Sequence, residues 1–211
     1  MFTYGNPFSS DYATAPIYFQ PINVVFAAIF RLTEADPGLL YVLFGVLAVV
    51  ACLRAIIALY QAAVPLQGLA AWLGLLLFAW GGGLLESAGL IHISLFGGKD
   101  PFVFDPAGGS WFLNLGRNLV FPLEAFYHLL FLGAILAMLR QRWRTGLALA
   151  ALLSASHPFT GIELLGILFG WVALERFLIG DRKVPVWLAP ALLALLALHA
   201  AYYLLYLNLD L

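Results

Sequence analysis

Long apolar runs separated by short polar turns dominate the chain. The run at 39–60 would form a helix about 33 Å long at 1.5 Å per residue, which exceeds the ~30 Å hydrocarbon core of a bilayer. Comparable runs follow at 66–85, 119–139 and 184–206. This pattern predicts an all-α polytopic membrane helical bundle.

The chain begins with a polar segment instead of an apolar run. Residues 1–16 contain neither the basic n-region nor the apolar h-region of a signal peptide. The following segment, 16–32, is apolar but short, and Gln20, Asn23 and Arg31 interrupt it. These features favour an N-terminal helix that lies in the membrane interface over one that crosses the bilayer.

Residues 146–179 admit two interpretations. One continuous helix kinked at Pro158 would be about 51 Å long and would place the basic segments before and after it on opposite sides of the membrane. A helix that breaks at 156–161 and resumes as a second helix places both basic segments on one side, as the positive-inside rule prefers. The broken helix pair is therefore favoured, and the bundle then has about six membrane segments.

The distribution of charge predicts the orientation of the chain. The basic loops 140–145 and 176–183 are expected in the cytoplasm, with residues 1–38 and the polar stretch 86–118 outside. Within that stretch, GGKDPFVFDPAGGSW (97–111) has the glycine, proline and aspartate content of a structured loop. The whole chain, 1–211, is predicted as one membrane domain, with two spans at 39–85 and the remaining spans at 119–206, in a bacterial inner membrane.

Composition excludes several classes of protein. Hydrophobic residues make up 64% of the chain and charged residues 10%, whereas a soluble domain is about 25% charged. A soluble enzyme, a disordered chain and a secreted disulfide scaffold are thereby excluded, and the lipid bilayer is the expected environment. The net charge of −1 provides no field that would attract nucleic acid. The one cysteine, Cys52, is interpreted as a buried apolar residue.

Three carboxylates lie in or beside apolar segments, toward their outer ends: Glu86, Glu124 and Glu163. A carboxylate at membrane depth usually faces a polar cavity or carries function. The alternative is a solvated position at the headgroup level, or an ion pair with Arg117. That arginine itself suits a lipid-linked phosphate, which a guanidinium binds with two hydrogen bonds, or it extends to the interface as many arginines do.

Other candidate ligands are two aspartates and the histidines. Asp100 and Asp105 offer carboxylate oxygens to a divalent metal, although Asp-Pro pairs also initiate ordinary turns. His128 and His199 lie inside spans at comparable depth, where they either ligate a haem or a chlorophyll-type pigment or are satisfied core side chains. His157, at the predicted break, either caps the following helix or lines a site.

Two segments resemble the GT-C membrane glycosyltransferase superfamily, which includes the protein O-mannosyltransferase-like enzymes. The first, 16–60, is similar to the family's juxtamembrane helix, short acidic loop and following span. The second, RQRWRTGLALAALLSASHPFTGIELLGILFGWVALERF (140–177), resembles its helix–break–helix segment. The chain departs from the family's Thr-Arg-Pro or Thr-Lys-Pro at this break, having Ser156, His157 and Pro158. It also departs in having fewer spans and no helix before the first loop, as a fragment or truncated relative would.

The resemblance implies transfer of a sugar from a polyprenyl-phosphate carrier at the outer face. An acidic residue of the first outer loop then serves as general base or metal ligand, and Asp11 stands near that position. His157 matches the basic residue at the break. Arg117 is a candidate phosphate contact on grounds of charge and depth alone.

Two other classes remain open from the sequence. One is a non-catalytic integral subunit that assembles with other membrane subunits and binds haem or pigment through His128 and His199. The other is a transporter, because transporters also contain broken helices, although no inverted repeat is visible.

Overall fold

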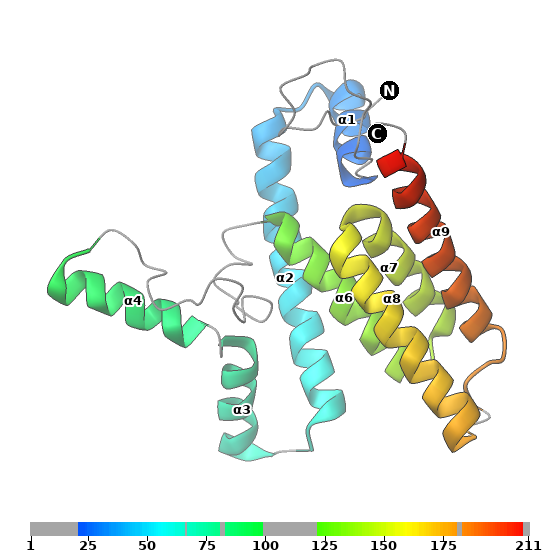
Figure 1. Cartoon of the computed structure of the whole chain (residues 1–211). Coiled ribbons are helices and arrows are strands. Elements are labelled where there is room, and N and C mark those ends of the chain that lie inside the picture. Colours follow the sequence, from blue (N-terminus) through cyan, green and yellow to red (C-terminus); the bar gives the residue numbers. More distant parts are fainter. Residues whose placement is uncertain (1–20, 66, 81–82, 99–121, 181–182, 209–211) are drawn as a thin grey trace. The chain divides into compact units, whose positions relative to one another are not determined.

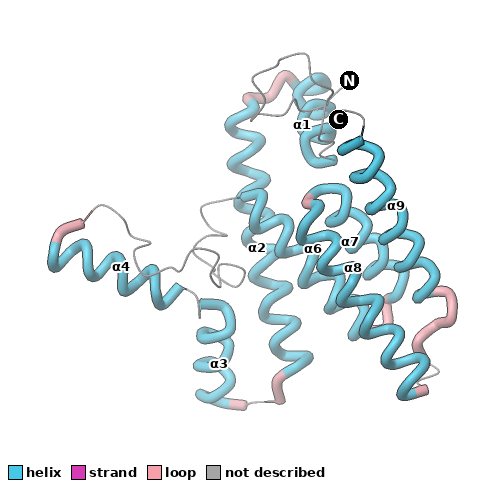
Figure 2. The backbone as a smooth tube through the Cα atoms, viewed as in Figure 1, coloured by secondary structure: helices cyan, strands magenta, loops and turns pink. Residues whose placement is uncertain are grey.

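The computed structural model describes residues 21–65, 67–80, 83–98, 122–180 and 183–208. Every regular element in this part of the chain is helical, as expected (Figures 1 and 2). The elements are α1 (Pro21–Thr33), α2 (Pro37–Ala63), α3 (Gly68–Trp80), α4 (Gly83–Phe96), α6 (Pro122–Leu139), α7 (Trp143–Ser156), α8 (Pro158–Ala173), the π-helix η2 (Leu174–Ile179) and α9 (Leu188–Asn208).

Two of these helices, α2 and α6, are long and apolar enough to cross a membrane. Shorter apolar stretches occur at Pro21–Thr33, Gly68–Phe78 and Leu188–Tyr202. The all-α class is therefore confirmed, whereas the arrangement of about six membrane segments stays a prediction. The helix expected at 16–32 is present from Pro21 to Thr33, and its place at the membrane interface also stays a prediction.

Three expected boundaries need correction. The loop expected from residue 86 is helical as far as Phe96, where α4 ends at Gly97 with a left-handed φ of 74° and a hydrogen bond of 3.0 Å from Gly97 N to Ile93 O. Polar side chains spaced among leucine and isoleucine hid this helix, because they do not prevent helix formation. The span expected at 66–85 is instead the 13-residue helix α3. The last helix begins at Leu188, after Pro185, and not at Val184.

The chain divides into two compact units. One contains α2 from Tyr41, α3, α4 and α6 as far as Leu132. In this unit the rings of Phe44 on α2 and Phe126 on α6 meet edge to face, with centroids 5.4 Å apart. Gly45 lies against Pro122, the first residue of α6, where a Cβ on Gly45 would come within 2.7 Å of the proline ring. The absence of a side chain at Gly45 thus lets α2 approach the start of α6 closely.

The second unit contains α1, the end of α6 from Gly133, and α7, α8 and α9. A turn at residues 140–142 joins α6 to α7, with Gln141 at a φ of 58° and Arg142 N donating to Ala137 O at 2.8 Å. Met138 lies against Gly146, and Gly133 against Leu149. The earlier position of α6 is therefore paired with the later position of α7, so the two helices are antiparallel.

The second turn of this unit is formed by His157 alone, between α7 and α8. The rings of Trp143, at the start of α7, and Trp171, near the end of α8, are 6.2 Å apart between centroids. Because the far ends of the two helices meet, α7 and α8 form an antiparallel hairpin, in agreement with the broken helix pair. The break is narrower than the expected 156–161, since Ser156 and Pro158 already belong to the helices.

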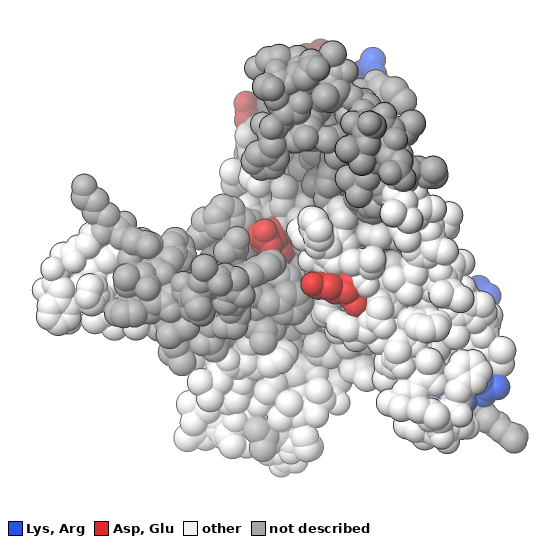
Figure 3. All heavy atoms as spheres, in the orientation of Figure 1, with Lys and Arg blue, Asp and Glu red and all other residues white. Residues whose placement is uncertain are grey.

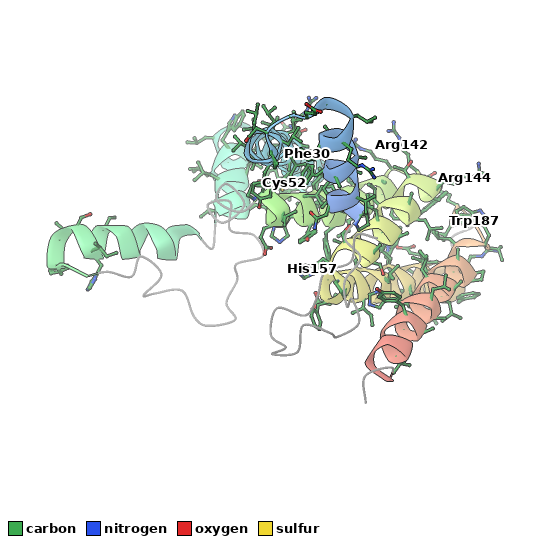
Figure 4. All side chains as sticks on the ribbon, turned by 90° about the horizontal axis from the view of Figure 1, so that it is seen from above. Phe30, Cys52, Arg142, Arg144, His157 and Trp187 are labelled. Atoms are coloured by element: carbon green, nitrogen blue, oxygen red, sulfur yellow. The ribbon has the colours of Figure 1, made fainter. Side chains whose placement is uncertain are left out.

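The hairpin places the two basic segments at one end. Arg142 and Arg144 flank Trp143, and Arg176 follows Trp171 by five residues. Figure 4 shows Arg142, Arg144 and Trp187 together at one end of this unit and His157 at the other. The cytoplasmic location of the basic segments stays a prediction.

Apolar side chains cover the outside of this unit as well as its core. Leu153, Leu164 and Leu192 are fully buried, whereas Phe177 and Leu178 are 69% and 79% exposed. Most of the described surface visible in Figure 3 is uncharged. A helix that is apolar on all sides is typical of a protein surrounded by lipid or by other subunits.

Candidate functional site

Polar groups within the α6–α9 unit gather around the turn between α7 and α8. His157 has an extended backbone (φ −141°, ψ 96°) and is the N-cap of α8, with Pro158 in the first turn. Its Nδ1 accepts a hydrogen bond from Thr160 N at 3.3 Å. Proline has no N–H to satisfy at a helix start and already has a helical φ. His157 and Pro158 together therefore end one helix and begin the next without an intervening loop.

The two helices touch directly beside this turn. A Cβ on Gly161 would overlap the Cα of Ser154, so only glycine permits this approach. The Ser156 hydroxyl donates to Leu152 O at 2.7 Å, and the side chain is fully buried. Thr160 is also buried, at 7% exposure. The first turn of α8 thus packs on the last turn of α7.

A histidine from α9 reaches the same place. The Ser154 hydroxyl and His199 Nδ1 are hydrogen-bonded at 2.5 Å, across 45 residues of chain. His199 is 9% exposed. Ser154 lies eleven residues after the start of α7, and His199 lies eleven residues after the start of α9. This bond joins α7 directly to α9.

We name these residues the turn cluster: Ser154, Ser156, His157, Thr160 and His199. Sequence analysis identified the two histidines but missed the serines and the threonine. The available signal was a pair of serines in an otherwise Leu/Ala-rich helix, immediately before His157 and Pro158. Hydroxyls in such a segment commonly bond to the backbone of their own helix, as Ser156 does, so the pattern alone does not separate Ser154 from Ser156.

The remaining candidate residues are distributed as follows. Glu163 is exposed on the second turn of α8, closer along the helix to His157 than to Trp171. Glu124 lies in the first turn of α6 and is partly buried. Glu86 belongs to α4, but its side chain lies outside the described part. Asp11, Asp100, Asp105 and Arg117 also lie outside the described residues.

His128 and His199 were expected as a pair of cofactor ligands. Both are buried, at 3% and 9% exposure. They belong to different compact units, His128 to the unit Tyr41–Leu132 and His199 to the unit that contains α7, α8 and α9. Their joint ligation of a haem or pigment stays a prediction.

Metal binding was expected at the two aspartates of the 97–111 segment. Among the described residues, no three histidine, cysteine, aspartate or glutamate side chains come together as a metal site would require. The expected metal ligands Asp100 and Asp105 lie outside this part of the chain, so their role also stays a prediction.

No family model, no curated protein and no solved structure matches the chain. Its function therefore follows from its own residues, above all from the turn cluster and from the basic segments at the opposite end of the α7–α8 hairpin.

Proposed function

We propose that the chain is an integral membrane glycosyltransferase of the GT-C kind in a bacterial inner membrane. It transfers a sugar from a polyprenyl-phosphate carrier at the membrane face opposite the basic segments. The supporting observation is the α7–α8 hairpin, which follows a basic turn and breaks at His157, where the resemblance to the GT-C superfamily predicts a break.

The charges of this unit agree with such an arrangement. Basic residues occupy the end of the hairpin that contains Trp143 and Trp171. Glu163 lies on the part of α8 closer to the turn cluster. Sugars are bound largely through hydroxyl groups, for which carboxylate, hydroxyl and imidazole side chains are suitable partners. The end of the hairpin that contains the turn cluster is therefore the more suitable end for binding a sugar.

The proposed chemistry is a displacement at the anomeric carbon of the donor sugar. The acceptor oxygen forms a bond to that carbon, and the bond from the carbon to the carrier phosphate breaks. The electron pair of the broken bond leaves with polyprenyl phosphate. Asp11, as the ionised base, takes the proton of the acceptor hydroxyl. Arg117 binds the phosphate and stabilises the charge that develops on it.

The test is sugar release from defined donors by the purified protein in proteoliposomes. Polyprenyl phosphates that carry radiolabelled sugars are supplied with a membrane extract as acceptor, and the labelled sugar transferred to the acceptor is separated from the remaining donor and counted. Asp11→Asn is expected to lower the rate by roughly 100-fold or more, because a general base contributes about that much. Unchanged turnover by this variant would exclude Asp11 as the base.

Asp36→Asn is the matched control. The Asp36 carboxylate accepts a hydrogen bond from Leu39 N at 2.8 Å at the start of α2. Asparagine caps a helix about as well as aspartate, so this variant is expected to keep both fold and activity. If the unaltered protein releases no sugar from any polyprenyl-phosphate donor, the glycosyltransferase proposal is wrong.

A second candidate function is a non-catalytic subunit that binds haem or a chlorophyll-type pigment. The observation in its favour is that His128 and His199 are both buried in strongly apolar helices. The visible absorption spectrum of the detergent-purified protein tests it directly. A Soret or chlorophyll-type band that shifts or bleaches in His199→Ala would support this candidate, and a colourless protein would contradict it.

A further inference from the structure

The end of the α6–α9 unit opposite the turn cluster combines positive charge with an apolar groove. Arg140, Arg142 and Arg144 lie at the α6–α7 turn, and Arg142 and Arg144 project away from the helices (Figure 4). The Trp143–Trp171 contact brings the end of α8 beside them, and Arg176 follows in η2. Lys183 follows η2; the three arginines of the turn and Lys183 are exposed, whereas Arg176 is half-buried. We name this set the basic end.

An open apolar groove of about 140 Å³ lies between the C-terminal part of α6 and the second half of α8. Its lining residues are Ile135, Met138, Leu139, Ile167, Leu168 and Trp171. Leu139 is directly followed by Arg140, and Trp171 contacts Trp143 between the two other arginines. The groove therefore opens next to the basic end.

We propose that this end binds an anionic phospholipid, with an acyl chain in the groove and the phosphate at the arginines. The site is separate from that of the proposed sugar donor, which we place at the opposite face. It rests only on the membrane location of the chain and not on sugar transfer.

Charge and shape both favour this occupant. The groove walls carry only apolar side chains, and Ile167 and Leu139 are 55% and 49% exposed along it. An acyl chain covers such surface without loss of hydrogen bonds. A guanidinium group binds phosphate oxygens through two parallel hydrogen bonds. Basic pockets between membrane helices are established positions for anionic lipid headgroups. A zwitterionic lipid fills the groove equally well, but its choline cation opposes the attraction of its phosphate to the arginines, so the anionic lipid should bind more tightly.

Tryptophan quenching by brominated lipid tests the proposal. The full chain is placed in nanodiscs of phosphatidylcholine that contain a small, fixed fraction of phosphatidylglycerol with dibrominated acyl chains. A matched preparation contains the same fraction of dibrominated phosphatidylcholine. The difference between the unaltered protein and Trp171→Phe isolates the emission of Trp171. We expect the anionic lipid to quench this emission about twofold or more beyond the zwitterionic lipid, because each basic residue adds attraction for the headgroup.

Substitutions of the arginines test the headgroup part of the site. In the double variant Arg142→Gln and Arg144→Gln, the preference for phosphatidylglycerol should fall roughly fivefold or more. Arg31→Gln removes one charge from α1, outside the basic end, and should leave the preference unchanged. Both arginines of the double variant are exposed, so the helices should remain intact.

The outcomes separate this site from the membrane location itself. If the chain enters nanodiscs and Trp171 is quenched equally by both lipids, the phospholipid site is wrong. If the preference survives in the double arginine variant, the assignment of the phosphate to these arginines is wrong. If the chain does not enter a bilayer, the membrane location and the lipid site fail together. None of these results depends on sugar transfer, which the donor assay measures separately.

Discussion

Gly161 of α8 lies so close to Ser154 of α7 that a Cβ on the glycine would overlap the serine Cα. The atom in the way is backbone, so a side-chain rotation does not relieve the overlap. This contact holds the first turn of α8 against the last turn of α7. It also places Ser154 where its hydroxyl meets His199 of α9.

Gly161→Ala is therefore expected to destabilise the protein. Forcing a methyl group into this contact should lower the free energy of unfolding by about 1–3 kcal/mol, measured by denaturant titration in detergent. Gly166→Ala, on the same helix, is the control, because a Cβ there meets no atom within 4 Å. Alanine at 166 should leave the stability unchanged or raise it by up to ~1 kcal/mol. Equal effects at both positions would contradict the close approach.

Ser154→Ala should cost more than Ser156→Ala. The first change leaves His199 Nδ1 without its serine partner, at a cost of about 1–3 kcal/mol in the free energy of unfolding. The second removes a hydroxyl that donates to Leu152 O, a carbonyl that the helix already uses, so less than ~0.5 kcal/mol should be lost. The same denaturant titration compares the two. A Ser154 variant as stable as the unaltered protein would show that the bond between α7 and α9 is not important.

His157 has a structural role that a substitution series can separate from a role in a site. His157→Ala removes the hydrogen bond from Thr160 N and should destabilise the protein by about 1 kcal/mol. His157→Asn should restore most of this loss, because asparagine is a good N-cap. If His157 is only a cap, the asparagine variant keeps full sugar transfer. A stable asparagine variant without transfer would instead place His157 in the site.

The antiparallel hairpin predicts which residues face the same side of the membrane. In a Cys52→Ser background, single cysteines at Thr145 and Val186 should both be shielded from a membrane-impermeant maleimide in intact cells. Both should react in inverted vesicles, because they lie at the same end of the α7–α8 pair. A cysteine at Ala35, in the loop between α1 and α2, should react in intact cells. Labelling of Thr145 and Val186 from opposite sides would contradict the hairpin, and labelling of both from outside would reverse the proposed orientation.

Local sequence was sufficient to locate most helices. Pro158 after His157 predicted a break, and the basic turn at 140–144 predicted the end of α6, because prolines and polar turns act on their immediate neighbours. The same reasoning missed α4. Polar residues spaced through 86–96 imitate a loop in composition, whereas the helix ends only where Gly97 takes up a left-handed conformation. Of the turn cluster, the sequence identified His157 and His199. It did not identify Ser154, whose hydroxyl joins His199 to α7.

The sequence by itself determined the helical class and the apolar character of nearly every helix, and it favoured a break within residues 156–161. The tertiary structure decided between the kinked helix and the antiparallel α7–α8 pair. It alone showed that Ser154 is the partner of His199 and that an apolar groove opens beside the arginines. The physical reason is that periodicity and helix caps act over a few residues along the chain. The pairing of helices instead depends on where a small side chain, such as Gly161 or Gly146, lets one backbone approach another. That complementarity belongs to two segments at once and is not visible in either alone.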